Sequence, residues 1–258
     1  MDNQTALQGK RILVIGGTTG IGLSAGNAFV AQGAKVVATG LSRTREDGKH
    51  WKFLNADAIA ENSAEIAVNH CVQVFGGLDA LFHVVGGSGR QWGDVPLHEL
   101  SLDGWQKTLT LNLTSVMLSN RAAIRYFLEQ QQPGCILNTS SVLAYSFAPK
   151  FFYTHAYSTA KAAIIGLSKA SAAFYAPENI RINVLAPALT DTPMAQRAAA
   201  NTEIQHYIKS KQPLDGGRMA QPDDLEGAVV FLLSDAARFI TGQVIAVDGG
   251  WEVSEGQY

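Results

Sequence analysis

Tyr157 and Lys161 stand one helical turn apart in the stretch Tyr157-Ser158-Thr159-Ala160-Lys161. Residues at positions i and i+4 share one face of a helix. A free tyrosine has a pKa near about 10, so proton transfer near neutral pH needs a shift worth roughly 4 kcal/mol. An ammonium at about 4 Å supplies that order of energy at an effective dielectric constant of about 20. The pair predicts a tyrosine that acts as general acid and base, with its pKa lowered by Lys161, although in isolation the same spacing is common in surface pairs.

Two further polar positions strengthen this hypothesis. Ser140 and Ser141 end the apolar run 135–139, and ligands bind beyond the carboxyl ends of strands in open α/β sheets. Ser141 is therefore a candidate for substrate contact, whereas Ser140 is expected to form the turn. Asn112 lies in an apolar helical stretch, where it either anchors a water that relays protons or satisfies a bend in the helix.

Gly16, Gly20 and Gly22 form a turn between a first apolar run and an amphipathic stretch. Glycines allow positive φ and let a ligand approach the backbone closely. The helix that follows offers unpaired N–H groups and a partial positive charge at its N-terminus. The turn predicts a dinucleotide pyrophosphate site, with a wider first gap than the GxGxxG of long-chain dehydrogenases.

The segment after the second expected strand bears on the choice of dinucleotide. It contains Ser42 and Arg43 and has no carboxylate before Glu46. An acidic residue there would bind the ribose hydroxyls of NAD and repel a 2′-phosphate. Ser42 and Arg43 can instead hold a 2′-phosphate, with Arg45 nearby, so we expect NADP(H) to be preferred and NAD(H) to remain possible. The alternative is that Arg43 is a solvated loop arginine. Asp57, after the third strand, either receives the adenine amino group or is a polar strand end.

The elements that must position these residues alternate along the chain. Apolar strand segments are separated by helical ones, which predicts one α/β domain over residues 1–258: a Rossmann-type, doubly wound parallel sheet with helices on both faces. The expected strands are 11–15, 34–39, 51–56, 78–85, 135–139, 181–185 and 243–247. The expected helices are 21–32, 61–75, 102–132 with a break near its middle, 156–175 and 222–234.

Composition excludes several classes of protein. The 258 residues include 20 basic and 22 acidic ones, so no basic excess favours nucleic acid. Apolar residues make up 47% and charged ones only 16%, which suggests surface buried between subunits. No apolar run approaches the roughly 20 residues of a membrane span, and the polar start lacks a signal peptide. Cys71 and Cys135 lie at a spacing that is typical neither of metal ligands nor of a redox pair. We expect them to be buried thiols in a reducing compartment. The protein is therefore expected to be soluble and cytoplasmic, with no metal.

Together these motifs resemble the short-chain dehydrogenase/reductase family over essentially the whole chain. The matching features are Gly16–Gly22, Asn112, Asn138-Thr139-Ser140-Ser141, Tyr157-x-x-x-Lys161, Asn183-Val184-Leu185-Ala186-Pro187 and the ending Phe239–Gly250. The resemblance implies NAD(P), alcohol–carbonyl interconversion on a small molecule, and a homodimer or homotetramer. It also implies that Ser141 binds the substrate oxygen, that Lys161 binds the nicotinamide ribose, and that Asn112 supports the proton relay.

The same resemblance implies a set of cofactor-binding residues that comes from several parts of the chain. They are Gly16, Thr18, Thr19, Gly20, Ile21, Gly22, Ser42, Arg43, Asp57, Ala58, Val84, Val85, Gly86, Tyr157, Lys161, Pro187, Thr190 and Thr192. Thr190 and Thr192 are expected near the carboxamide.

The chain departs from the family pattern at three places. Ile15 replaces a threonine before the first glycine, and Pro187-Ala188 replaces Pro-Gly. His83-Val84-Val85-Gly86 replaces Asn-Asn-Ala-Gly, and we expect His83 to be a core histidine bonded to neighbouring backbone rather than a catalytic one.

Two segments and the function itself admit alternatives. The irregular stretch 190–217 is either a substrate lid or a surface excursion. The aromatic block Tyr145, Phe147, Phe151, Phe152, Tyr153 and His155 either lines an apolar pocket or serves an oligomer contact or ordinary packing. An NAD(P)-dependent oxidoreductase of secondary alcohols and ketones explains the serine, tyrosine, lysine and asparagine set. A non-catalytic dinucleotide sensor or scaffold needs none of these residues, and a methyltransferase leaves Tyr157 with Lys161 unexplained.

Overall fold

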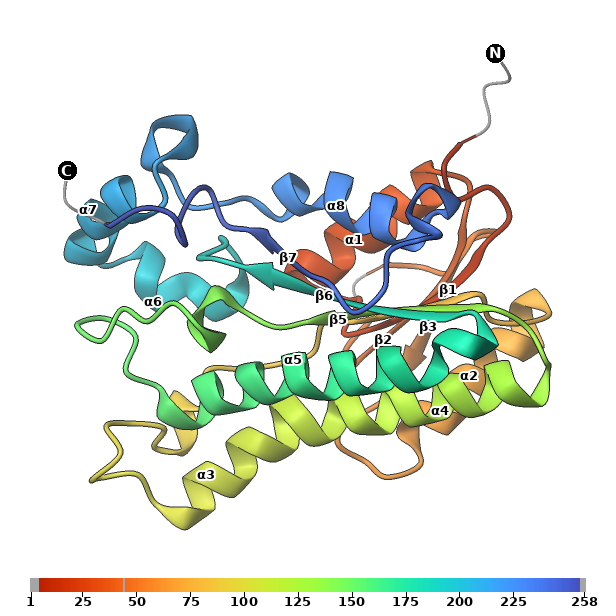
Figure 1. The fold of residues 1–258 in the computed structure, drawn as a ribbon, viewed down its shortest axis with the longest axis horizontal. Coiled ribbons are helices and arrows are strands. Elements are labelled where there is room, and N and C mark those ends of the chain that lie inside the picture. Colours follow the sequence, from red (N-terminus) through yellow and green to blue (C-terminus); the bar gives the residue numbers. More distant parts are fainter. Residues whose placement is uncertain (1–4, 44, 256–258) are drawn as a thin grey trace.

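A seven-stranded sheet runs through the centre of the molecule (Figure 1), which we describe for residues 5–43 and 45–255 of a computed structural model. All neighbouring strands pair in parallel, as expected from their continuous apolar sequences. The strands are β1 (Arg11–Ile15), β2 (Lys35–Gly40), β3 (Trp51–Asn55), β4 (Ala80–His83), β5 (Gly134–Thr139), β6 (Ile180–Pro187) and β7 (Val244–Val247). The predicted Rossmann-type sheet is thereby confirmed.

The strand order places the ends of the central strands together. The order is β3-β2-β1-β4-β5-β6-β7, so the chain changes direction across the sheet between β1 and β4. Ile15 pairs with His83, and His83 pairs with Asn138. The residues that follow β1, β4 and β5 therefore emerge at one edge, where open α/β sheets bind their ligands.

Helices cover both faces of the sheet (Figure 1). The α-helices of the described residues are α1 (Gly20–Ala31), α2 (Ser63–Phe75), α3 (Leu102–Leu109), α4 (Ser115–Glu129), α5 (His155–Tyr175), α6 (Gln196–Ala199), α7 (Thr202–Lys211) and α8 (Glu226–Leu233). Of these, α6 and α7 lie beyond the end of the sheet (Figure 1). Side chains of α1 and α8 pack in one buried cluster around Phe29 and Phe82. Side chains of α2 and α4 pack in a second cluster around Ile136 and Phe127 on the other face.

The expected break in the long helical region is confirmed as a π-helical turn over Thr110–Thr114. The Asn112 side chain donates to the carbonyl of Thr108 over 2.9 Å, four residues earlier. A side chain that takes the carbonyl of the preceding turn competes with the regular helical hydrogen bond and widens the helix. The helix continues as α4 and ends at Glu129, earlier than the expected end at residue 132.

Other boundaries also differ from the expectation. The stretch 190–217 contains the helices α6 and α7, so its description as irregular was wrong. A buried cluster that includes Ile204 and Ile208 stabilises it, and this packing overrides its mixed local composition. β4 is shorter than expected, and the segment 222–234 begins as a 3₁₀ turn before α8.

Cys71 and Cys135 are buried free thiols, as expected. Among the described helices, none combines the length and apolar character needed to span a membrane.

Candidate active site

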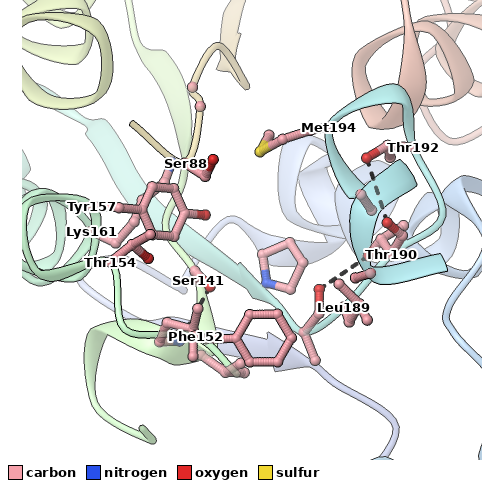
Figure 2. A pocket seen from close by; sticks show the side chains of 18 of the residues that line it. Ser88, Ser141, Phe152, Thr154, Tyr157, Lys161, Leu189, Thr190, Thr192 and Met194 are labelled. Atoms are coloured by element: carbon pink, nitrogen blue, oxygen red, sulfur yellow. Dashed lines mark hydrogen bonds between the residues drawn. The ribbon is translucent and has the colours of Figure 1, made fainter. Parts of the chain in front are cut away.

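Tyr157 and Ser141 face a common cavity of about 540 Å³. The cavity lies beyond β5 and β6, and side chains from the Val84–Gln91 segment and from α6 close its sides. Figure 2 shows the Tyr157 hydroxyl pointing toward the open centre, with Ser88 and Ser141 on either side. The Ser141 side chain acts on the Tyr157 hydroxyl in the direction that lowers its pKa. Two hydroxyl groups aimed at one open space can both bind one substrate oxygen.

The first turn of α5 carries Tyr157, and a carboxylate distant in sequence accepts the free backbone N–H groups of that turn. Thr154, at the N-cap position, makes no capping hydrogen bond. Asp94 accepts hydrogen bonds from the backbone N–H groups of Ala156 and Tyr157 instead, each over 2.9 Å. Asp94 is 0% exposed, so these bonds are shielded from water. The sequence analysis missed this residue, because nothing in the local pattern links it to a helix more than sixty residues later.

Lys161 lies behind Tyr157 on the same helix, as predicted. Its Nζ is 5.5 Å from the centre of the Tyr157 ring and donates to the Thr139 carbonyl over 2.9 Å. The side chain is 3% exposed. Burial lowers the pKa of Lys161 to about 8, because a desolvated ammonium is costly.

The expected lowering of the Tyr157 pKa by Lys161 is not found. Desolvation raises the pKa of Tyr157 to about 12, and only the Ser141 side chain opposes that shift. The Lys161 ammonium lies over the Tyr157 ring and donates to the Thr139 carbonyl, and it contributes no lowering of the Tyr157 pKa. The residues described here do not by themselves prepare Tyr157 to ionise near neutral pH.

Asn112 connects the π-helical turn to the loop after β4. The residue is 0% exposed. Its Nδ2 donates to the carbonyls of Gly87 and Thr108, each over 2.9 Å, and its Oδ1 accepts from the Gly87 N–H over 3.1 Å. A Cβ at Gly86 would lie 2.7 Å from that Oδ1 and 3.1 Å from the Lys161 Nζ. Asn112 therefore satisfies the bend in the helix, which is one of the two roles expected for it, and it does so close to Lys161.

The glycine turn has the geometry of a close-approach site. Gly16 has a φ of 90° and Gly20 a φ of 50°. A Cβ at Gly22 would lie 2.1 Å from the Gly16 carbonyl oxygen, so this position admits only glycine without movement. The helix α1 begins at Gly20, so its N-terminus lies at this turn at the edge of the sheet. Within the described chain, Thr139 Oγ1 is buried at the cavity without a hydrogen-bond partner. These features fit a dinucleotide with its phosphates at the turn.

The residues expected to bind the cofactor fall into two groups. Eight of them line the cavity: Ile21, Val84, Gly86, Tyr157, Lys161, Pro187, Thr190 and Thr192. Thr192 also reaches the glycine turn, since a Cβ at Gly20 would lie 3.1 Å from its Cγ2. The others do not line it: Gly16, Thr18, Thr19, Gly20 and Gly22 at the turn, Val85 against Gly16, and Ser42, Arg43, Asp57 and Ala58 beyond β2 and β3.

Arg43 has carboxylate partners of its own. Its guanidinium lies 3.3 Å from Glu46 and 3.6 Å from Asp47, and it stacks 5.3 Å from the centre of the Phe53 ring. Arg45 stacks on Trp51 and donates to Asn27 over 2.6 Å. Both arginines are therefore engaged locally, at an exposed site where such pairs are weak.

His83 is a core residue, as expected. It is 0% exposed, and its Nδ1 lies 2.8 Å from the Ser119 hydroxyl while its Nε2 lies 3.3 Å from that of Ser115. Serine hydroxyls are thus its side-chain partners, in addition to the expected backbone near Val85. Burial lowers its pKa to about 3, so the ring is neutral at physiological pH.

One member of the aromatic block lines the cavity and others do not. Phe152 lines the cavity and packs against Trp251, whereas Phe147 is 64% exposed. Phe151 stacks on Tyr207 of α7, outside the cavity lining. Arg90, Arg197 and Trp251 are among the lining side chains that were not predicted from the sequence, because only tertiary structure brings them here.

Residues 16–252 match the profile of a family described as Enoyl-(Acyl carrier protein) reductase. The chain is 34% identical to 2,5-dichloro-2,5-cyclohexadiene-1,4-diol dehydrogenase of Sphingobium indicum, over 95% of this chain and 98% of that one. It is 32% identical to cis-4-hydroxycyclohexanecarboxylate dehydrogenase of Sinomonas cyclohexanicum, over 94% and 96% of the two chains. A 3beta-hydroxysteroid dehydrogenase of Eggerthella lenta is 31% identical over 95% of each chain.

Solved structures agree with this assignment. The structure of levodione reductase superposes with a TM-score of 0.85 at 26% identity, covering 96% of this chain and 99% of that one. Aldohexose dehydrogenase of Thermoplasma acidophilum gives a TM-score of 0.82 at 26% identity, covering 97% of both chains. The chain belongs to the short-chain dehydrogenase/reductase family and is an NAD(P)-dependent oxidoreductase.

Proposed function

We propose that Tyr157 is the general acid and base of this oxidoreductase and that Ser141 holds the substrate oxygen beside it. The observation that carries the proposal is that the Ser141 and Tyr157 side chains line the same cavity, with Lys161 one helical turn behind. During oxidation Tyr157 takes the hydroxyl proton of the alcohol, and during reduction it returns a proton to the carbonyl oxygen. Ser141 orients that oxygen and shares its developing negative charge.

The dinucleotide, when bound, supplies the carbon that accepts or donates the hydride. Its positive charge in the oxidised state would stabilise the ionised form of Tyr157, which the protein residues do not. Lys161 would hold the nicotinamide ribose through the N–H donors that its bond to Thr139 leaves free. Asn112 would support proton relay to Lys161 by fixing the Gly86–Gly87 backbone beside the ammonium.

The other cofactor contacts follow the order of the strands. The glycine turn would hold the pyrophosphate, and Thr190 and Thr192 would contact the carboxamide. Asp57 and Ala58, beyond β3, would contact the adenine. NADP(H) is the preferred form, because Ser42 and Arg43 follow β2 without an intervening carboxylate. Its 2′-phosphate must displace Glu46 and Asp47 from Arg43, and an exposed pair of this kind offers little resistance.

The substrate is a cyclic secondary alcohol or the corresponding ketone. Three relatives carry names with a ring-bound hydroxyl: a cyclohexadienediol, a hydroxycyclohexanecarboxylate and a hydroxysteroid. The segment 190–217 acts as the lid over the substrate, since Met194, Ala195 and Ala198 line the cavity. A homodimer or homotetramer is supported by the apolar side chains that α4 and α5 expose, Leu128 at 40% and Phe174 at 73%.

The test is turnover by Tyr157→Phe on a panel of cyclic alcohols and ketones with NADP(H) and NAD(H). We expect a loss of about 100-fold or more in kcat with unchanged dinucleotide affinity, since only the proton-transferring hydroxyl is removed. Tyr175→Phe, at the far end of α5, is the matched control and keeps full activity. Unchanged turnover by Tyr157→Phe contradicts the proposed role. The substrate panel also includes an enoyl thioester, because the family profile that matches this chain is described as an enoyl reductase.

The cofactor preference has its own measurement. Arg43→Ala should weaken NADPH binding by about tenfold, as expected for one lost phosphate contact, and leave NADH binding unchanged. Arg125→Ala removes an exposed arginine paired with Glu65 and serves as control. Tighter binding of NADH than NADPH by the wild type contradicts the preference. Tight dinucleotide binding with no turnover of any panel member favours the sensor or scaffold alternative.

A further inference from the structure

The cavity beside Tyr157 is lined by positive charge without negative charge. Among the described residues that line it, Arg90, Lys161 and Arg197 are cationic, and none is aspartate or glutamate. Lys161 has a place in the proposed function, next to the nicotinamide ribose. Arg90 and Arg197 have no role in hydride or proton transfer as proposed.

The two arginines come from separate parts of the chain and converge. Arg90 lies in the 3₁₀ turn Arg90–Trp92 after β4, and Arg197 lies in α6. Both donate to the same acceptor, the Phe151 carbonyl oxygen, over 3.2 Å and 3.3 Å. Partial burial and the charge of Arg90 both lower the pKa of Arg197. Two guanidinium groups thus meet at one edge of the cavity.

Neither arginine forms an ion pair within the part of the chain that the structure describes, and the Tyr153 ring is the only aromatic face that Arg90 contacts there. By contrast, Arg11, Arg43, Arg125 and Arg218 each lie against a carboxylate. A guanidinium carries five N–H donors, of which one carbonyl satisfies one. Two like charges that share one neutral acceptor form a ready site for an anion, which guanidinium groups bind in bidentate fashion.

The other side chains that line the cavity indicate the kind of molecule that carries the anionic group. Apolar side chains also line this cavity, among them Leu143, Phe152, Leu189, Met194 and Trp251. A hydrocarbon skeleton fits such a lining. Tyr157 and both arginines line one cavity of about 540 Å³, which has room for a compact skeleton with a polar group at each end.

We propose that the substrate is a hydroxy acid or keto acid whose carboxylate is held by Arg90 and Arg197 while its hydroxyl or carbonyl carbon lies at Ser141 and Tyr157. This inference rests on the proposed function and adds the substrate class. It assigns the two arginines to substrate specificity, and it gives the Phe151 carbonyl the role of holding both guanidinium groups in place.

Binding of a non-reacting acid tests the inference without turnover. The probes are cyclohexanecarboxylate and cyclohexanecarboxamide, titrated calorimetrically into the enzyme saturated with NADPH. We expect the acid to bind at least about tenfold more tightly than the amide, since hydrogen bonds to a charged group are worth more than neutral ones. Arg90→Gln and Arg197→Gln should each remove most of this difference, whereas Arg125→Gln, far from the cavity lining, should keep it.

Three results would overturn the proposal. In the first, the wild type binds the amide as tightly as the acid. In the second, both arginine variants lose affinity for acid and amide equally, which indicates that the arginines only hold the Phe151 loop. In the third, the variants weaken NADPH itself, which assigns the arginines to the dinucleotide.

Turnover separates this inference from the proposed function. The substrates are 4-hydroxycyclohexanecarboxylate and its carboxamide, compared by kcat/KM. Preference for the acid, lost in the arginine variants but not in Arg125→Gln, supports the substrate class. If neutral alcohols react through Tyr157 with no effect of the arginine variants, the proposed function stands and the substrate class is wrong. If no alcohol or ketone reacts at all while the acid still binds through the arginines, the proposed function is wrong and the anion site remains.

Discussion

Asp94 accepts a hydrogen bond from the backbone N–H of Tyr157 over 2.9 Å, across 63 residues of sequence. Its second oxygen accepts from Ala156, so one buried carboxylate satisfies two N–H groups at the start of α5. The first turn of a helix leaves such donors without intrahelical partners. The backbone that carries the reactive hydroxyl is therefore fixed by a residue from the loop after β4.

Asp94→Ala should lower stability and turnover together. We expect a loss of about 1–2 kcal/mol in the free energy of unfolding, as for a removed helix cap. The first turn of α5 would loosen, and kcat should fall because Tyr157 is no longer held at the cavity. Urea unfolding and steady-state kinetics measure the two effects.

Asp94→Asn should recover part of both losses, because its amide oxygen can accept one of the two bonds. Asp103→Asn is the control: this exposed carboxylate of α3 pairs with Lys107 and should affect neither quantity. An Asp94→Ala variant with normal kcat would show that the cap does not position Tyr157.

Gly22→Ala should disrupt the glycine turn. The added Cβ would lie 2.1 Å from the Gly16 carbonyl oxygen and 2.7 Å from Val84, which forces the backbone to move. Overpacking of this kind costs about 1–3 kcal/mol. Calorimetric NADPH binding should weaken by about tenfold or more, since the turn that approaches the phosphates is displaced.

Gly227→Ala is the matched control for that substitution. Gly227 also lies in the first turn of a helix, α8, and a Cβ there meets nothing within 4 Å. Alanine is the better helix former by up to about 1 kcal/mol, so this variant should be as stable as the wild type or more stable. Equal NADPH affinity in Gly22→Ala and the wild type would contradict the proposed phosphate site.

His83 should make the protein sensitive to acid. Its pKa is about 3 in the folded protein, against 6.5 for an unperturbed histidine. Between these values the unfolded chain binds a proton that the folded one does not, so stability is present above 6.5 and is lost as the pH falls toward 3. The loss amounts to at most about 1.4 kcal/mol per pH unit in this window.

His83→Asn should flatten this part of the pH profile, measured by urea unfolding from pH 7 down to about pH 4.5. Asparagine cannot be protonated in this range and can still bond the Ser119 hydroxyl. His98→Asn, an exposed histidine of 78% side-chain exposure, should leave the profile unchanged. An unaltered slope in His83→Asn would mean that other groups govern acid unfolding.

Lys161 should produce a rise in stability on the alkaline side. Its pKa is about 8 in the folded protein and 10.5 when unperturbed, because burial disfavours the ammonium. Below about 8 the folded state bears the full cost of the buried charge, and that cost disappears as the pH rises toward 10.5. The free energy of unfolding, measured without dinucleotide between pH 7.5 and about 9.5, should increase by up to about 1.4 kcal/mol per pH unit.

Lys161→Met should remove this rise, since it has no group to deprotonate. Lys169→Met, an exposed lysine of the same helix, should keep it. If both variants retain the wild-type slope of unfolding free energy against pH, burial of the Lys161 ammonium does not explain the rise in stability.

Much of the fold could be predicted from local pattern. Alternating strand and helix segments gave all seven strands in approximate place, because buried parallel strands must be continuously apolar. The break at Asn112 was also visible, since a polar residue in an apolar helical stretch needs partners. The segment 190–217 was misread because its helices are stabilised by packing around Ile204 and Ile208, which local composition does not report.

The sequence by itself determined which groups can do chemistry: a phenol and an amine one helical turn apart, a serine at a strand end and glycines at a strand–helix turn. Spacing within one helix or one turn is fixed by local geometry. Only the tertiary structure decided the surroundings of those groups. It half-buried Tyr157, so that desolvation raises its pKa, brought Asp94 to the start of α5, and set Arg90 beside Arg197 at the cavity. Desolvation and contacts between distant segments depend on the packing of the whole chain, and no local pattern contains them.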